Sequence, residues 1–132
     1  MLKRMASARS EHSWLVAERD GAVVGWAATM PYLLLEEYAG VAEFSVYVAP
    51  DCQGVGIGRL LMAALMSTAE HAGLYKMTSR VFARNLASRA LLAQAGFREV
   101  GTYKRHVRSP DGWQDVVIVE ALLGDARTDN QN

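Results

Sequence analysis

Alternating apolar and polar positions predict an antiparallel first half of the chain. Residues 14–19 and 22–30 are rich in apolar residues that favour strands. Asp20-Gly21 lies between them and indicates a hairpin turn, because both central residues of a type I′ turn need positive φ. Residues 31–40 predict a turn with at most one helical turn. Residues 42–50 predict a further strand.

That strand, 42–50, has two distinct faces. Period-two alternation places Phe44, Val46 and Val48 on one face, and Ser45 and Tyr47 on the other. We therefore expect one side of this strand to be buried and the other to carry polar and aromatic groups.

The pattern then changes to a helical period. Five side chains recur on one predicted helical face: Leu60, Leu61, Ala64, Leu65 and Thr68. The helix is expected to end near Ala72-Gly73, where glycine is a natural C-cap.

The second half alternates strands with one more helix. Strands are predicted over 75–83, 97–108 and 113–123, and a helix over 85–96. Asn85 is suited to be its N-cap, and Gly96 follows its last turn. The element order predicts an α/β fold, a mixed sheet with helices on its faces, in a single domain over residues 1–132.

Composition excludes several classes of function. The 132 residues carry 14 basic and 14 acidic side chains, so no broad basic field is available for nucleic acid. No apolar run approaches the roughly 20 residues that span a bilayer. The three histidines show no metal-ligand spacing, and a single cysteine, Cys52, fits a reducing cytoplasm. We expect no nucleic-acid partner, no membrane and no metal.

Three glycines, Gly54, Gly56 and Gly58, stand between a predicted strand and a predicted helix. Such a loop favours an anion site, because a helix N-terminus presents unpaired N–H groups and glycines let a ligand approach the backbone. It is neither a Walker A loop nor a Rossmann fingerprint, since Gly-Lys-Ser/Thr is absent and position 59 is Arg59. The alternative is a turn that only redirects the chain.

Two motifs in order carry a family resemblance. "Gln53-Gly54-Val55-Gly56-Ile57-Gly58-Arg59-Leu60-Leu61" resembles the Q/R-x-x-G-x-G/A acyl-CoA loop of the GNAT superfamily of N-acetyltransferases. "Asn85-Leu86-Ala87-Ser88…Ala95-Gly96-Phe97" resembles its downstream signature of Asn, helix and Gly-Phe. The resemblance covers Trp14 to Leu123 and looks most like the phosphinothricin N-acetyltransferase group. It implies a mixed, splayed sheet flanked by helices.

The resemblance also implies acetyl-CoA as co-substrate. Its pyrophosphate would be held by the loop Gln53, Gly54, Val55, Gly56, Ile57, Gly58, Arg59 and Leu60, and its pantetheine amides by the strand Val46, Tyr47 and Val48. Asn85 and Ser88 would contact the cofactor arm, although an N-cap also explains Asn85.

The implied reaction is direct acetyl transfer to the primary amine of a small molecule, an amino acid or analogue. Because free amines are mostly protonated at neutral pH, a base is needed. The resemblance places it at Glu43, which opens an apolar strand and could be partly buried. The alternative is a solvated glutamate at a strand start.

The chain departs from the family in its general acid and its substrate loop. The position that carries a tyrosine or histidine acid in relatives is Leu92, and Tyr75, Tyr103 and His106 are candidate substitutes. Leucines at 33–35 stand where the group has arginines, which indicates either a less anionic substrate or a core or dimer contact.

The start of the chain is a third departure. Only 13 residues precede Trp14, and residues 3–11 are compatible with a short helix. The family's first strand and helix would then be missing, which leaves a sheet edge uncovered. Either a second protomer covers this edge, which is the basis for expecting a homodimer, or the coding start lies further upstream. Two alternatives to the small-molecule enzyme stay open: a protein or peptide N-acetyltransferase, and a non-catalytic CoA-binding sensory module.

Overall fold

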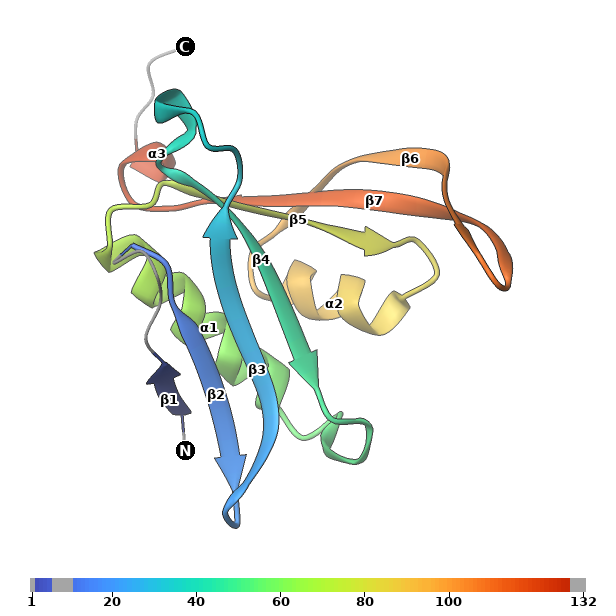
Figure 1. The fold of residues 1–132 in the computed structure, drawn as a ribbon, viewed down its shortest axis with the longest axis horizontal. Coiled ribbons are helices and arrows are strands. Elements are labelled where there is room, and N and C mark those ends of the chain that lie inside the picture. Colours follow the sequence, from blue (N-terminus) through green and yellow to red (C-terminus); the bar gives the residue numbers. More distant parts are fainter. Residues whose placement is uncertain (1, 6–10, 129–132) are drawn as a thin grey trace. The chain divides into compact units, whose positions relative to one another are not determined.

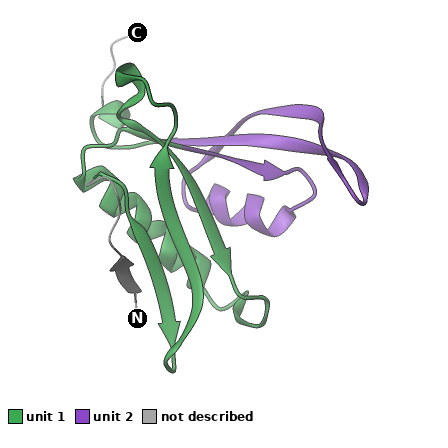
Figure 2. Cartoon of the chain, viewed as in Figure 1, with its two compact units in different colours: residues 1–77, 122–132 green, residues 78–121 purple. Residues whose placement is uncertain are grey.

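The computed structural model describes residues 2–5 and 11–128. The chain forms two compact units: residues 1–77 with 122–132, and residues 78–121 (Figure 2).

The first unit is built on four antiparallel strands in sequential order. These are β1 (Leu2–Met5), β2 (Trp14–Arg19), β3 (Ala22–Pro31) and β4 (Val41–Val48) (Figure 1). The hairpin between β2 and β3 is confirmed, since Asp20 and Gly21 have φ of 53° and 82°. A short 3-10 turn at Glu36–Tyr38 is the single helical turn expected between β3 and β4.

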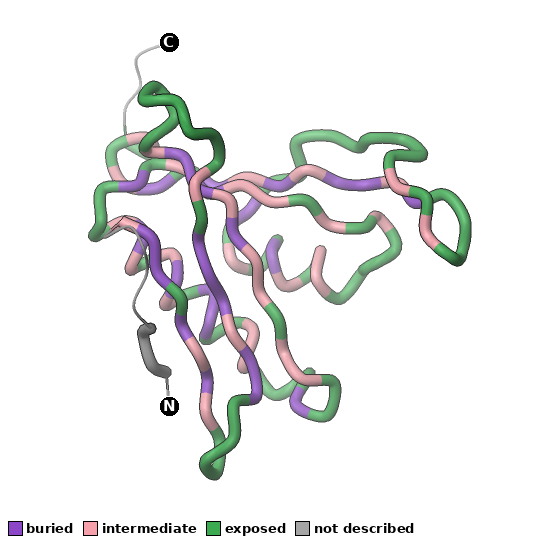
Figure 3. The backbone as a smooth tube through the Cα atoms, in the orientation of Figure 1, coloured by how far each residue is buried: buried purple, intermediate pink, exposed green. Residues whose placement is uncertain are grey.

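Helix α1 (Ile57–His71) packs against β2, β3 and β4 of this unit. Its buried residues are Leu61, Met62, Leu65 and Ala69. Leu60 was expected on the buried face, but it is 52% exposed. The buried stripe of α1 follows the i, i+4, i+8 spacing from Leu61. Leu60, one position before Leu61, therefore lies at the edge of that stripe. Figure 3 shows buried stretches along α1 and the strands that it contacts.

Gly25 on β3 allows α1 to approach the sheet closely. A Cβ at this position would lie 2.8 Å from the backbone oxygen of Tyr47, 3.1 Å from Cδ1 of Leu61 and 3.4 Å from Cγ2 of Ile57. The first turn of α1 therefore rests on a β3 backbone that carries no side chain at this point.

Two backbone bonds show that the sheet is mixed. The N–H of Tyr75, just before β5 (Lys76–Phe82), donates to the oxygen of Gly40, just before β4, at 2.8 Å. The two strands therefore start together, as in a parallel pair. The N–H of Leu123, just after β7 (Gly112–Leu122), donates to the oxygen of Tyr75 at 2.8 Å, as in an antiparallel pair.

The described residues after β7 are connected to the end of α1. Asp125–Thr128 forms a short helix, α3. Glu70 of α1 accepts hydrogen bonds at 2.6 Å from the Gly124 N–H and from the Arg127 guanidinium. These two bonds join the segment to the end of α1.

The second unit holds strands in the order β5, β7 and β6 (Arg98–Ser109), with helix α2 (Leu86–Gln94). The predicted N-cap is confirmed, since Oδ1 of Asn85 accepts a hydrogen bond from the Ser88 N–H at 3.1 Å. Arg89 of α2 makes two 2.8 Å bonds to the Glu99 carboxylate and a third, of 2.7 Å, to the Ala83 oxygen.

The start of the chain corrects one expectation. Residues Leu2–Met5 form strand β1 rather than part of a helix over 3–11, and residues 6–10 lie outside the described part of the chain. β1 pairs with β2 in register from Leu2 opposite Ala17 to Met5 opposite Trp14. The edge of β2 is therefore covered along this stretch. The homodimer loses the argument that rested on an open edge and stays a prediction.

The α/β class and the mixed sheet with flanking helices are confirmed. The strand and helix boundaries agree with the sequence prediction to within a few residues from Trp14 onward.

Candidate functional site

The glycine loop leads from β4 into α1 through left-handed backbone conformations. A 3-10 turn at Pro50–Cys52 follows β4, and Gly54 and Gly56 have φ of 82° and 90°. The first intrahelical bond runs from the Leu60 N–H to the Gly56 oxygen at 3.0 Å. The N–H groups ahead of it in α1 have no acceptor within the helix, and the Gly56 cap supplies no side chain. The start of α1 thus presents backbone donors with a partial positive charge.

The space around this loop is open. A Cβ added at Gly54 or Gly56 would meet nothing within 4 Å, so backbone conformation rather than crowding selects glycine there. Gln53, Gly54, Val55 and Gly56 are all exposed. A ligand can therefore reach the backbone of the loop.

Gln53 joins the loop to the end of β4. Its Nε2 donates to the Val48 oxygen at 3.2 Å. The Ala49 N–H donates to the Val24 oxygen of β3 at 2.8 Å, and hydrogen-bonding direction alternates along an antiparallel strand. The amide groups of Val46 and Val48 consequently point away from β3. The predicted pantetheine strand and the predicted pyrophosphate loop are thus neighbours in the first unit.

Glu43 lies on the sheet face opposite α1. Its pairing partner on β3 is Met30. Ser45, two residues further along β4, lies on the same face. The Glu43 residue is half-buried. Its role as the base stays a prediction.

An aromatic row continues this face. Trp26 lies opposite Tyr47, with ring centroids 6.3 Å apart, and Trp14 of β2 lies 5.7 Å from Trp26. Trp14 and Tyr47 are 47% and 49% exposed. The face that carries Glu43 is consequently apolar and accessible.

Asn85 and Ser88 belong to the second unit. The Asn85 oxygen is engaged in capping α2. Leu92 of the same helix is buried at 2% exposure, which confirms that this position holds core and no proton donor. Among the substitutes, Tyr103 and His106 stack with ring centroids 4.5 Å apart.

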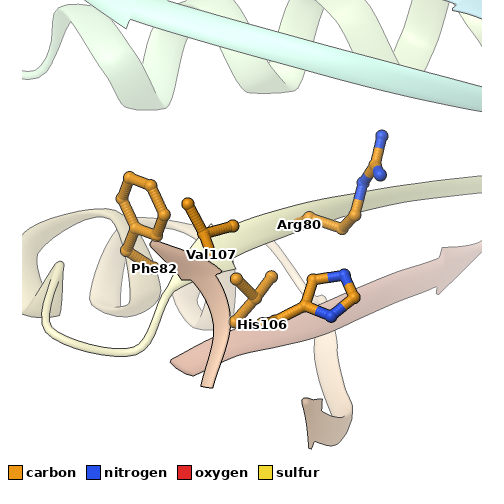
Figure 4. Close-up of a pocket in the computed structure, with 5 residues that line it drawn as sticks. Arg80, Phe82, His106 and Val107 are labelled. Atoms are coloured by element: carbon orange, nitrogen blue, oxygen red, sulfur yellow. The ribbon is translucent and has the colours of Figure 1, made fainter. Parts of the chain in front are cut away.

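A pocket within the second unit was missed by sequence reasoning. Its volume is about 340 Å³, and it is lined by Arg80 and Phe82 of β5, His106 and Val107 of β6, and Val116 of β7 (Figure 4). The i, i+2 spacing of Arg80 and Phe82 could have indicated that they share one face of a strand. The sequence could not have indicated which face His106 and Val107 share, because a bulge in β6 sets the direction of their side chains.

That bulge lies between Tyr103 and Val107, whose partners on β7 are Val116 and Gln114. Three β6 residues therefore face Asp115 alone. Asp115 accepts the Arg105 N–H at 2.8 Å and lies 3.4 Å from the Lys104 ammonium. The backbone bond from Arg105, helped by Lys104, lowers the pKa of Asp115. Arg105 has a positive φ of 49°, which the Asp115 bond helps to hold.

Metal ligands, the cysteine and membrane-spanning helices are the remaining features of the described residues that bear on function. No group of three or more His, Cys, Asp or Glu residues there is placed to hold a metal ion. Cys52 is buried, and its Sγ lies 3.7 Å from Asp51. None of the described helices combines the length and apolar character needed to cross a bilayer.

Comparison with known proteins agrees with this geometry. Residues 2–97 match the model of the acetyltransferase (GNAT) family. A phosphinothricin N-acetyltransferase of Streptomyces coelicolor is 38% identical over 101 residues, which are 76% of this chain and 59% of that protein. The L-amino acid N-acyltransferase MnaT of Escherichia coli is 31% identical over 115 residues, covering 87% of this chain and 66% of that protein.

Solved structures show the same fold. A phosphinothricin acetyltransferase from Sinorhizobium meliloti, in complex with AcCoA, aligns with a TM-score of 0.85 at 25% identity, over 93% of this chain and 67% of that one. YncA of Salmonella typhimurium, with its cofactor acetyl-CoA, gives a TM-score of 0.83 at 28% identity, over 86% and 66%. The chain spans 59% of the S. coelicolor relative and 56% of one from Alcaligenes faecalis. The fold, the loop and the family match together establish that the chain belongs to the acetyltransferase (GNAT) family.

Proposed function

We propose that the protein transfers an acetyl group from acetyl-CoA to the primary amine of a small molecule, an amino acid or an analogue of one. The observation that carries this proposal is the continuous segment from β4 into α1. It places a half-buried carboxylate, a strand edge that points away from β3 and an open glycine loop within one unit. Phosphinothricin and L-amino acid acyltransferases among the relatives support the substrate class.

The loop residues fit the phosphate end of acetyl-CoA. Backbone N–H groups of the loop 53–60 would bind the pyrophosphate, favoured by the positive end of the α1 dipole. Val46 and Val48 would pair with the pantetheine amides, since both expose the same edge of β4. Asn85 and Ser88 would contact the cofactor arm. When bound, acetyl-CoA supplies an activated acyl thioester.

Glu43 would accept the proton that the amine must lose. A glutamate does this directly or through one water molecule within hydrogen-bond reach. The neighbouring Met30 and the aromatic row from Trp14 to Tyr47 provide an apolar surface for the body of the amine. Because residues 33–35 are leucines, that loop offers no guanidinium to an anionic substrate.

Calorimetry with acetyl-CoA, followed by thiol release with a panel of amines, tests the proposal. We expect acetyl-CoA to bind and free CoA to be released with amino acids or their analogues. Failure to bind acetyl-CoA would mean that the glycines form only a turn.

A second candidate is a non-catalytic CoA-binding module. Buried Leu92 favours it, because the acid position of the relatives is part of the core here. This candidate predicts acetyl-CoA binding without CoA release for any amine. Acetyl transfer does not require an acid in principle, since a thiol with a pKa near 8.5 leaves readily as thiolate.

A further inference from the structure

We propose that a second pocket, at the C-terminal end of α1, binds an organic cation: an ammonium group attached to a small hydrocarbon. Every residue that lines this pocket belongs to residues 1–77 or 122–132, so the first unit forms it alone. Binding there is independent of the proposed acetyl transfer.

The pocket lies between the end of α1 and the segment that follows β7. Gly73 lies on the α1 side, and Gly124 and Asp125 lie on the other. Glu70 joins the two sides, since its carboxylate accepts the Gly124 N–H and the Arg127 guanidinium, both at 2.6 Å. The volume of the pocket is about 370 Å³, at the low end of small-molecule sites.

Asp125 gives the pocket a negative charge that the protein leaves unmatched. Glu70 and Asp125 line the pocket, and none of the lining residues is basic. Arg127 already matches the charge of Glu70. Asp125 is exposed, and among the described residues its carboxylate has no hydrogen-bond or ion-pair partner. The C-terminal end of α1 adds a partial negative charge, so the pocket favours a cation.

An aromatic ring and an aliphatic side chain favour an organic cation over a metal ion. Tyr75 is 40% exposed and lines the pocket beside the buried Leu74. A cationic nitrogen is attracted to the face of an aromatic ring, and hydrocarbon would cover the apolar lining. A metal ion would leave that lining uncovered, and no group of three or more His, Cys, Asp or Glu residues in the described ranges could hold one.

The Tyr75 ring is held in place before any ligand binds. The Tyr75 N–H donates to the Gly40 oxygen, and the Tyr75 oxygen accepts the Leu123 N–H, each at 2.8 Å. Gly40 makes room for the ring, because a Cβ at this position would overlap it. A ring that is already ordered lowers the entropic cost of binding.

The pocket and the glycine loop lie at opposite ends of α1. The helix has 15 residues, which span about 22 Å at the usual rise per residue. A cation in the pocket would therefore not compete with acetyl-CoA at the loop.

Titration of the full chain with two matched probes, without acetyl-CoA, tests the pocket. We expect cyclohexylmethylammonium to bind at least about tenfold more tightly than cyclohexylmethanol, because an ion pair and a cation–π contact both favour the ammonium. The backbone NMR signals of Gly73, Tyr75 and Gly124 should shift with it. Asp125→Asn should remove the preference, and Asp125→Glu should keep part of it.

Asp20→Asn is the matched control. It removes the same charge from an exposed turn of the same unit, and an Asn-Gly turn keeps the hairpin. Its probe preference should equal that of the unchanged chain. Equal affinity of the two probes, or equal loss in the Asp125→Asn and Asp20→Asn variants, would overturn the proposal. If a variant fails to fold in thermal unfolding, the signals that shift in the unchanged chain decide the question.

Two further outcomes would also overturn the proposal. Shifts confined to Ser45 and its neighbours would place the ammonium beside Glu43 instead. Displacement of the ammonium by an equal concentration of Mg²⁺ would show a metal site. Acetyl-CoA binding and CoA release should be the same in Asp125→Asn as in the unchanged chain, so a failure of the proposed acetyl transfer is distinguishable from a failure of the pocket.

Discussion

At the scale of single residues, Glu43 and Leu92 lie in different environments and differ in whether they can transfer a proton. The resemblance assigns proton transfer to the positions of Glu43 and Leu92. Glu43 is half-buried on an accessible face, whereas Leu92 is in the core. Under the proposed function, Glu43 would remove a proton from the amine, and Leu92 would supply none to the leaving group. Glu43 is therefore the residue on which catalysis should depend most.

We predict that Glu43→Gln lowers kcat by about 10²-fold or more, the scale of general base catalysis. Gln keeps the shape of the side chain but cannot accept the proton. Acetyl-CoA affinity by calorimetry should be unchanged. The control is Glu36→Gln, an exposed acid in the Glu36–Tyr38 turn, which should leave turnover intact. Normal turnover in the Glu43 variant would remove it from the mechanism.

At the scale of elements, the position of the glycine loop depends on how closely α1 approaches the sheet. Gly25 sets that distance, and α2 is fixed in its own unit by Arg89 and the Asn85 cap. These contacts lead to two predictions about stability.

Gly25→Ala should destabilise the fold by about 1–3 kcal/mol, the usual cost of overpacking, because the Tyr47 oxygen cannot easily move from a Cβ at 2.8 Å. It should also weaken acetyl-CoA binding, since the first turn of α1 must shift. Urea unfolding and calorimetry measure the two effects. Gly101→Ala is the control, where a Cβ would meet nothing within 4 Å. Equal stability of both variants would contradict the packing argument.

The Arg89–Glu99 pair should make stability depend on pH. The hydrogen bond from Arg89 to the Glu99 carboxylate lowers the pKa of Glu99 from the ordinary value of 4.5. The folded state therefore gains stability while Glu99 is ionised, and loses that gain as pH falls through the lowered pKa. Glu99→Gln should be less stable than the unchanged chain at pH 7, and the difference should shrink below pH 4.5.

Thermal unfolding across this pH range measures the difference. Glu37→Gln removes an exposed carboxylate from the 3-10 turn and serves as the reference. A Glu99 effect that stays constant down to pH 3 would show that the ion pair is not its origin.

At the scale of the whole molecule, the effect of acetyl-CoA on stability tests the proposed binding site. A ligand that binds only the folded state raises stability by RT ln(1 + [L]/Kd), about 2.7 kcal/mol at one hundred times Kd. Acetyl-CoA should therefore raise the unfolding temperature of the protein. No change at millimolar acetyl-CoA would argue against the loop as a phosphate site.

Local signals allowed much of the fold to be predicted. Asp20-Gly21 gave the hairpin and Asn85 the start of α2, because turn and cap geometry depend on a few adjacent residues. The exposure of Leu60 and the pairing of Leu2–Met5 with β2 were not predictable in this way. Both depend on which neighbour a segment packs against, and a short stretch of sequence does not contain that information.

The candidate site likewise has features that neighbouring residues predict and features that depend on tertiary contacts. The spacing of Gly54, Gly56 and Gly58, and of Glu43 three residues before Val46, by itself determined the family resemblance and the expected loop, since these residues are close in the chain. Only the tertiary structure decided that Leu92 is core, and that Arg80 and His106 line one pocket. The reason is physical: a β-bulge and a strand pairing bring together residues 26 positions apart, and their energies depend on contacts that exist only after folding.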